Sequence, residues 1–330
     1  MPAAPDSAAS GATSAARITW IREDRAHGAS FLAREAADIL RACAESGLSS
    51  DAPASLAPAA RALENLHAAA RELADARPSM MALANTAGRI WDAAAHVPGK
   101  PPRSDSEAAA RLALRAALEA ATTALAEMAD AATQITSHAA PLIQGTLLTH
   151  SLSGTVQTVL MACKAQLEHV YVTEARPRCE GRETARALVS AGIPTTLLTD
   201  AEAGIFLSQC QAVVVGADTV LADGAVVNKA GTYLLALAAR AKRPRPIPLL
   251  VLTEQMKIAP YHDEHLEEMD PAEVAASADL PGIVLRNIYF DRTPAALVTK
   301  LITEAGPLSR SQIRAQAAQA RRWARLLARD

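Results

Sequence analysis

A regular alternation of apolar runs and helix-length segments occupies the second half of the chain, after Leu142. Strands that are apolar on both faces and separated by helices are typical of a parallel sheet covered by helices on both sides. This pattern predicts an α/β fold for the second half. The predicted strands are GTLLTHS (145–151), HVYVTE (169–174), PTTLLTD (194–200), AVVVGAD (212–218), IPLLVLTE (247–254) and IVLRNI (283–288).

Nearly every one of these runs ends in a polar residue. Open parallel sheets bind ligands at the carboxyl ends of their strands, because the loops that follow the strands converge there. We therefore expect a ligand site at that edge of the sheet. The polar ends are Ser151, Glu174, Asp200, Asp218, Glu254 and Asn287.

The first half of the chain follows a helical pattern and has few β-branched runs. Apolar residues recur at helical spacing, which predicts a helical bundle between residues 17 and 142. Residues 1–16 are rich in Ala, Ser, Gly and Pro and are predicted to be a disordered tail. Residues 143–330 then form the α/β domain. The predicted helices cover residues 30–40, 56–76, 79–95 and about 106–138.

Composition excludes several classes of protein. The net charge of −2 argues against nucleic acid as the main ligand. No stretch approaches the ~20 apolar residues of a membrane span, and the start of the chain has no secretory pattern. The expected compartment is the cytoplasm, and neither a metal nor a cofactor is expected. Four cysteines without metal-ligand spacing are interpreted as reduced thiols: Cys43, Cys163, Cys179 and Cys210.

The segment from Gly216 to Arg240 carries the most chemical information. Asp218 stands where a buried strand ends, and Asp223-Gly224 predicts a tight two-residue hairpin turn. Asn228-Lys229 are then expected to open a helix whose free N–H groups favour an anion. The alternative is an ordinary strand, hairpin and helix in which Asp218 is a cap.

Other polar segments are predicted to join this site. The loop 149–155 carries Ser151 and Ser153, whose hydroxyl groups suit a phosphate, unless they only cap the next helix. Adjacent strand residues point to opposite faces, so His150 is not expected to activate Ser151. Arg176 offers a fork for phosphate or carboxylate, with a solvated turn as the alternative. Further candidate cations are Arg25, Arg77 and Lys257.

Several blocks of the chain together resemble the alpha, beta and delta subunits of translation initiation factor 2B. They equally resemble the related methylthioribose-1-phosphate and ribose-1,5-bisphosphate isomerases. The resemblance covers roughly residues 17–308 and implies a helical N-terminal domain, a Rossmann-like C-terminal domain and a homodimer through the C-terminal domain. The blocks include RAHGAS (25–30), ARPSMMALAN (76–85), LLTHSLSGTV (147–156), GADTVLADGAVVNKAGTYLLALAAR (216–240) and NIYFDRTPAALVTKLITEAGPL (287–308).

The resemblance also assigns roles to single residues. In the isomerases, a cysteine thiolate after the first strand and the aspartate of the GAD motif move protons between sugar carbons. Asp218 matches that aspartate, whereas Ser151 stands at the cysteine position. A serine hydroxyl needs a neighbouring base to act, unlike a thiol with a pKa near ~8.5. The resemblance implies phosphate contacts at Arg25, Gly28, Arg77, Asn228, Lys229 and Lys257, although His27 interrupts the family's RGA pattern.

The sequence thus predicts an initiation factor 2B-like protein that binds a phosphorylated sugar or nucleotide at the sheet edge. The serine at position 151 predicts that isomerase activity is absent. One alternative is an active aldose–ketose isomerase of a ribose phosphate, with Asp218 as acid and base. Another alternative is a regulatory subunit of a translation initiation complex.

Overall fold

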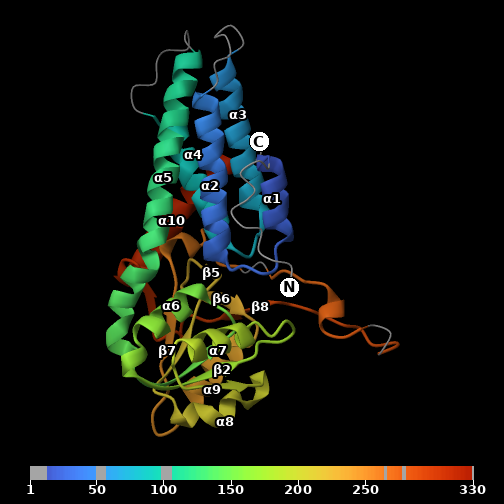
Figure 1. Cartoon of the computed structure of the whole chain (residues 1–330), viewed down its shortest axis with the longest axis vertical. Coiled ribbons are helices and arrows are strands. Elements are labelled where there is room, and N and C mark those ends of the chain that lie inside the picture. The colour runs from blue at the N-terminus through green and yellow to red at the C-terminus, as the bar shows by residue number, and fades with distance from the viewer. Residues whose placement is uncertain (1–12, 50–56, 98–105, 264–265, 277–279, 329–330) are drawn as a thin grey trace. The chain divides into compact units, whose positions relative to one another are not determined.

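The computed structural model describes residues 13–49, 57–97, 106–263, 266–276 and 280–328 (Figure 1). The chain divides into two compact units. One contains residues 1–129 and 319–330, and the other contains residues 130–318. Both divisions fall inside long helices, α5 (Ser106–Ala139) and α10 (Arg310–Leu327). The chain therefore passes between the units along helical backbone rather than through a linker.

The division by packing groups some residues differently from the change in sequence pattern at residue 142. Residues 130–142 belong to the α/β unit, and residues 319–330 belong to the helical unit. Of the predicted tail, residues 1–12 lie outside the described residues, and residues 14–16 already belong to the first helix. Helices that continue across a division give no change of sequence pattern at that point.

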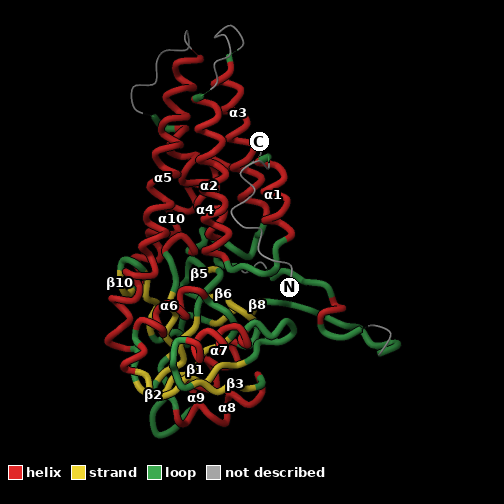
Figure 2. Tube along the Cα trace, viewed as in Figure 1, coloured by secondary structure: helices red, strands yellow, loops and turns green. Residues whose placement is uncertain are grey.

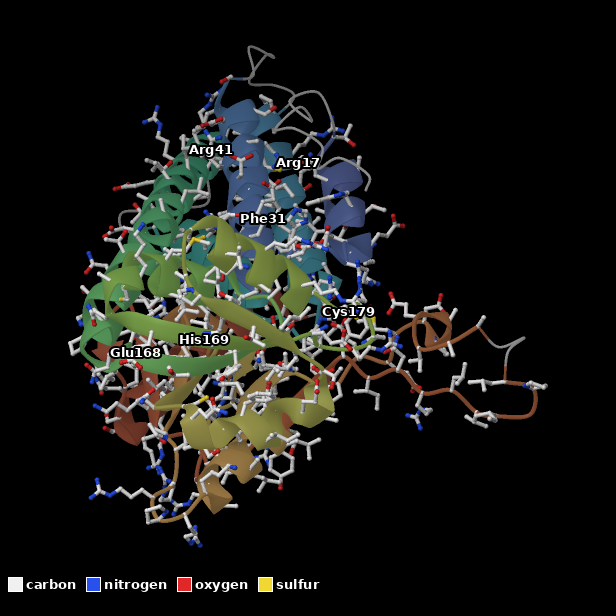
Figure 3. The ribbon with its side chains drawn as sticks, turned by 60° about the horizontal axis from the view of Figure 1, so that its bottom comes forward. Arg17, Phe31, Arg41, Glu168, His169 and Cys179 are labelled. Carbon is white, nitrogen blue, oxygen red and sulfur yellow. The ribbon has the colours of Figure 1, made fainter. Side chains whose placement is uncertain are left out.

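The first unit is helical, as the periodicity predicts. The predicted helices at 30–40, 56–76, 79–95 and 106–138 are confirmed, with an additional helix before them. Arg17, labelled in Figure 3, connects the first two helices. Its guanidinium lies 2.9 Å from Glu35 and 3.0 Å from Asp38. The helices are α1 (Ser14–Glu23), α2 (Ala29–Leu48), α3 (Pro58–Ala76), α4 (Met81–Ala95) and the first part of α5.

Small residues allow the helices of this unit to approach closely. A methyl group added at Gly47 on α2 would lie 2.5 Å from the Cβ of Ala62 on α3. Ala36 and Ala37 on α2 are completely buried. Such contacts place backbones near one another without large side chains, which is how a chain with 3% aromatic residues fills its interior.

The second unit is built on a seven-stranded sheet with the order β10-β9-β7-β4-β1-β2-β3. The strands are drawn in yellow in Figure 2. All neighbouring strands are parallel except β10 and β9. The strand order reverses direction between β1 and β4. The strands are β1 (Gly145–His150), β2 (Leu167–Thr173), β3 (Thr195–Leu198), β4 (Ala212–Val215), β7 (Leu249–Leu252), β9 (Lys300–Thr303) and β10 (Gly306–Pro307).

Apolar side chains alternate between the two faces of the sheet. On β4, Val213 and Val215 pack with α8 (Ala203–Phe206), α9 (Thr232–Ala241) and the start of α10. Val214 faces the opposite core, which α6 (Gly154–Ala162), α7 (Gly181–Ser190) and the end of α5 complete. The α/β fold with a mainly parallel sheet and a helical N-terminal region is thereby confirmed. Short 3-10 turns are Ala140–Leu142, Lys164–Gln166, Asp200–Glu202, Leu207–Gln209, Gln255–Lys257 and Pro271–Glu273.

A small antiparallel sheet follows β4. It contains β5 (Thr219–Val220), β6 (Val226–Lys229) and β8 (Phe290–Thr293). The predicted hairpin exists between β5 and β6, but its loop has three residues rather than two, because the Leu221 N–H donates to the Ala225 carbonyl. Gly224 has the left-handed φ of 87° that the last residue of such a loop requires.

The prediction of a strand at 283–288 is wrong. In that segment only Ile288 forms an isolated bridge, to Glu268. Ile283 and Val284 are 58% and 84% exposed, so the apolar run has no sheet to pack against. The parallel strand that does follow β7 in the sheet is β9. Its apolar core is only Leu301 and Ile302, too short a run to stand out in the sequence.

Candidate functional site

The reversal of strand order between β1 and β4 marks where a parallel sheet opens a crevice at its carboxyl edge. The loops that follow these two strands are in close contact. A methyl group on Gly216, directly after β4, would lie 2.6 Å from the Ser153 hydroxyl oxygen after β1. A glycine at position 216 permits this approach without displacing the Ser153 side chain, so the two loops form one surface.

The loop after β1 is shaped by backbone as well as side-chain contacts. Ser151 is buried and has a left-handed φ of 66°, and its carbonyl accepts a hydrogen bond from the Thr184 hydroxyl at 2.8 Å. Ser153 caps α6, since its hydroxyl accepts from the Val156 N–H at 3.4 Å. The capping alternative therefore applies to Ser153. The space beside Gly154 is open, because an added methyl group would meet no atom within 4 Å.

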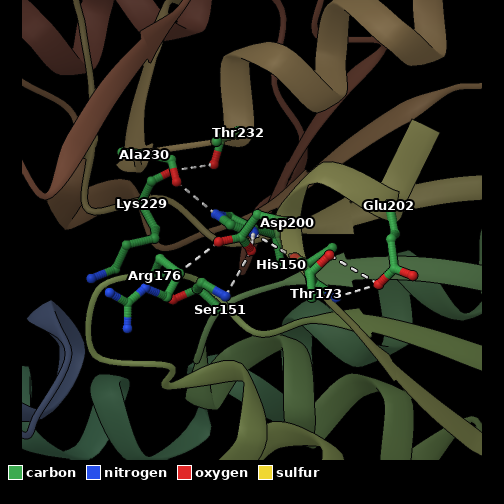
Figure 4. A network of polar contacts seen from close by, with 12 residues as sticks. His150, Ser151, Thr173, Arg176, Asp200, Glu202, Lys229, Ala230 and Thr232 are labelled. Atoms are coloured by element: carbon green, nitrogen blue, oxygen red, sulfur yellow. Dashed lines mark hydrogen bonds and ion pairs between the residues drawn. The ribbon is translucent and has the colours of Figure 1, made fainter. Parts of the chain in front are cut away.

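His150, the last residue of β1, joins four segments of the sheet edge (Figure 4). Its Nδ1 lies 2.6 Å from the Thr173 hydroxyl, and its Nε2 lies 3.0 Å from the Ala230 carbonyl. Asp200 lies 3.9 Å from Nδ1 and accepts the backbone N–H groups of Ala175 and Arg176. Burial lowers the pKa of His150 against the opposing influence of the Asp200 carboxylate. Burial therefore favours the neutral form of the imidazole.

Asn228 and Lys229 end strand β6 instead of opening a helix, so that prediction is wrong. The pairing of β6 with β8 holds them in the small sheet. The buried Lys229 ammonium lies 2.7 Å from the Glu180 carboxylate and 4.2 Å from the centre of the Tyr289 ring. Asn228 donates to the Thr232 hydroxyl at 3.0 Å. The cation is thus already half of a partly buried ion pair.

Helix α9 begins at Thr232, and its first turn is occupied by the chain's own carboxylate. Asp291 accepts the N–H of Gly231 at 2.7 Å and that of Tyr233 at 3.1 Å. Asp291 thus supplies the negative charge that was predicted to come from a ligand at a helix start.

The other predicted residues of this unit occupy separate places. Asp218 follows β4 and its N–H donates to the Val227 carbonyl, beside β6. Lys257 is buried, and its ammonium lies 3.0 Å from Glu254, which also accepts from the Thr155 hydroxyl. The Arg176 guanidinium donates to the carbonyls of Pro177 and Val274.

Within the helical unit, Arg25, Gly28 and Arg77 gather around the loop before α2. The buried Arg77 donates to the Asp24 carbonyl at 2.7 Å, and Arg25 donates to the same carbonyl at 2.8 Å. Gly28 is the N-terminal cap of α2 and has open space at its Cα. The structure thus brings these three predicted residues together in their own unit.

A model of the initiation factor 2 subunit family matches residues 25–310. The chain belongs to this family. Ribose 1,5-bisphosphate isomerase of Archaeoglobus fulgidus is 38% identical over 49% of this chain and 53% of that protein. Methylthioribose-1-phosphate isomerase of Pelotomaculum thermopropionicum is 43% identical over 42% of this chain and 40% of that protein. A putative translation initiation factor eIF-2B subunit 2-like protein of Pyrococcus horikoshii is 37% identical over 55% of this chain and 65% of that protein.

The match to this chain thus covers between 40% and 65% of the length of each of these three curated relatives. Solved structures align over more of the chain. The translation initiation factor eIF-2B of Pyrococcus horikoshii OT3 has a TM-score of 0.67 and 32% identity, covering 89% of this chain and 96% of that one. The tetrameric eIF2B-beta2-delta2 complex of C. thermophilum has a TM-score of 0.69 at 20% identity, covering 94% of this chain and 95% of that chain, and supports the fold.

Several residues that contact the candidate site residues could not be predicted from the sequence. Glu180, Tyr289 and Asp291 contact the segment around Lys229 from 49 or more residues away. Thr173 and His150 meet across neighbouring strands. That last pair follows from the parallel register of β1 and β2, which aligns His150 with Thr173, whereas the three long-range contacts have no local signal. The described helices include none long and apolar enough to cross a membrane.

We predict that Asp291→Asn changes how the stability of this family member depends on pH. Burial raises the pKa of Asp291 to about 6. A raised pKa means that the folded state holds the proton more tightly, so this contribution to the free energy of unfolding is complete below about pH 4 and is lost as the pH rises through about 6. The contribution is at most about 3 kcal/mol.

Urea unfolding at several pH values between 4 and 7 measures this effect. The difference in free energy of unfolding, parent minus Asp291→Asn, should fall as the pH rises, because other groups cancel in the difference and an amide does not titrate. Two curves that stay parallel over this range would show that Asp291 titrates alike in the folded and unfolded states.

Proposed function

We propose that this chain binds a phosphorylated sugar or nucleotide at the carboxyl edge of its parallel sheet. The observation that carries the proposal is the contact of the Gly216 and Ser153 loops where the strand order reverses. Asp218 follows one of these loops, and Ser151 precedes the other. The similarity to isomerases whose names specify ribose bisphosphate and methylthioribose phosphate supports this ligand class.

The polar groups of the site suit a ligand that carries both hydroxyl and phosphate groups. Lys229 pairs with Glu180, and Lys257 pairs with Glu254. Each pair offers a donor and an acceptor side by side, and an anionic group can replace the carboxylate at the ammonium. We also propose Asn228, Ser153 and Arg176 as ligand contacts. In the helical unit, Arg25, Gly28 and Arg77 form a group suited to an anion at the start of α2.

We further propose that the chain does not catalyse isomerisation. Ser151 stands where the resembling isomerases have a thiol, and a serine hydroxyl requires a base. The neighbouring His150 directs both ring nitrogens to Thr173 and Ala230, so neither nitrogen is available to Ser151. The alternative of an active ribose phosphate isomerase is supported by Asp218 at the end of β4. A role as a subunit of a translation initiation complex is supported by the 32% identity to the Pyrococcus eIF-2B structure.

We predict that ribose 1,5-bisphosphate, methylthioribose 1-phosphate or a nucleoside monophosphate stabilises the protein. At a hundred times the dissociation constant the stabilisation is about 2.7 kcal/mol. Lys229→Ala should weaken binding by roughly 1.5–3 kcal/mol, because it removes a charged contact. Urea unfolding with and without ligand measures the stabilisation, and calorimetric titration measures the change in affinity.

Because loss of Lys229 leaves Glu180 without its cation, the double variant Lys229→Met/Glu180→Gln accompanies the single one. Lys164→Ala, which changes an exposed lysine after α6, is the matched control and should bind like the parent. If both Lys229 variants bind as tightly as the parent, Lys229 is not in the site. If no ligand of the three classes binds the parent, the proposed function itself is wrong.

We predict that the parent protein does not turn over ribose 1,5-bisphosphate or methylthioribose 1-phosphate at enzymatic rates. Ser151→Cys restores the thiol of the resembling isomerases close to the start of α6, an environment that favours a thiolate, and should introduce turnover. A coupled assay of ketose formation measures the rate. Robust turnover by the parent that disappears in Asp218→Asn would instead establish the isomerase alternative.

We propose that the chain forms a homodimer through its α/β unit. Helices α8 and α9 are in contact and expose Ile205 (68%), Leu234 (69%) and Leu237 (40%) on one unit. Burying such side chains stabilises an interface by roughly 1.5–3 kcal/mol each. Ile205→Asp/Leu234→Asp should therefore give a monomer in sedimentation velocity. Val189→Asp changes an exposed residue on α7 and is the control. If Ile205→Asp/Leu234→Asp remains a dimer, the interface lies elsewhere.

A further inference from the structure

His150 is a buried side chain whose two hydrogen-bond partners are Thr173 on β2 of the large sheet and Ala230, the residue directly after β6 of the small sheet. Only 2% of the residue is exposed, although it ends a strand at the edge proposed for ligand binding. A carbonyl oxygen can only accept, so Nε2 carries the hydrogen and donates to Ala230 at 3.0 Å. Nδ1 then accepts from the Thr173 hydroxyl at 2.6 Å. The ring is thereby fixed as one tautomer between β2 and the segment that follows β6.

Three hydrogen bonds of that segment, residues 229–231, involve Ala230 and the N–H of Gly231. The Ala230 carbonyl accepts from His150, the Ala230 N–H donates to the Tyr289 carbonyl at 2.7 Å, and the Gly231 N–H donates to Asp291. The imidazole also supports the segment sterically. A methyl group at Gly231, where φ is 113°, would lie 3.0 Å from the ring. Of the three contacts, only the one from His150 connects the segment to the large sheet.

We propose that His150 is a positioning residue that holds the backbone of Lys229 against the large sheet and so places the Lys229 ammonium for the ligand. The inference rests on the proposed function, in which Lys229 contacts the ligand. The path is short, because Ala230 is the next residue after Lys229. The charged groups around the ring are Asp200, Glu180 and Lys229, of which Figure 4 labels Asp200 and Lys229. Glu180 holds the Lys229 ammonium at the other end of that side chain.

The arrangement requires a ring with one donor and one acceptor. Phenylalanine would keep the contact with Gly231 but would leave the Ala230 carbonyl without its donor. Glutamine can direct an amide N–H to the same carbonyl while losing the contact of Nδ1 with Thr173. His150→Phe is therefore expected to release the segment, and His150→Gln to restore part of its order.

Amide hydrogen exchange in the ligand-free protein tests the positioning directly. His150→Phe should accelerate exchange at Ala230, Gly231 and Tyr233 about tenfold or more relative to Val213 in the large sheet, and His150→Gln should accelerate it less. His169→Phe is the matched control, because His169 also contacts a threonine of the next strand, Thr196, at 2.9 Å. Unchanged exchange in His150→Phe would overturn the proposal.

Nitrogen NMR of the histidines provides a readout that needs no variant. The structure requires His150 to carry its hydrogen on Nε2, and a hydrogen on Nδ1 alone would be incompatible with the bond to Ala230 and would overturn the proposal even if the variants fail to fold.

A binding cycle with ribose 1,5-bisphosphate then tests whether His150 acts through Lys229. His150→Phe should weaken binding about tenfold in the parent and leave it unchanged in the Lys229→Met/Glu180→Gln background. Equal weakening in both backgrounds would contradict action through Lys229. If the parent does not bind this probe, the proposed function fails for it, while exchange and NMR still decide the role of His150.

Discussion

The contact between Gly216 and Ser153 is the constraint on which the proposed site depends. It joins the loops after β1 and β4 at the one place in the large sheet where the strand order turns back. Because β1 also pairs with β2, the same strand brings His150 to Thr173. Strands β5 and β6 of the small sheet follow β4 after short connections. Lys229 is the last residue of β6 and is therefore close to β4 in the chain.

The charges at this edge are balanced within the chain. Glu180 neutralises Lys229, Glu254 neutralises Lys257, and Asp291 occupies the start of α9. Burying any of these charges alone would be costly, which explains why each one has a partner. A ligand therefore exchanges existing contacts rather than meeting free charges. This requirement favours a ligand with donors and acceptors in alternation, as in a sugar phosphate.

Much of the fold could be predicted from the sequence, because strands buried on both faces are continuous apolar runs. The prediction failed at 283–288, where an apolar run is exposed, and missed β9, whose apolar pair is short. For the proposed site, Ser151 and Asp218 could be predicted as candidates because each follows an apolar run in the sequence. The partners of Lys229 could not be found, since the contact with Glu180 spans 49 residues and depends on the packing of two sheets.

A crystal structure with bound ribose 1,5-bisphosphate tests the central claim most directly. The account predicts ligand density at the carboxyl ends of β1 and β4, within hydrogen-bond distance of Lys229 and the loop that begins at Ser151. It also predicts that the Ala230 carbonyl still accepts from His150 in the complex. Density for the ligand at the amino edge of the sheet, or at the start of α9 in place of Asp291, would contradict the account.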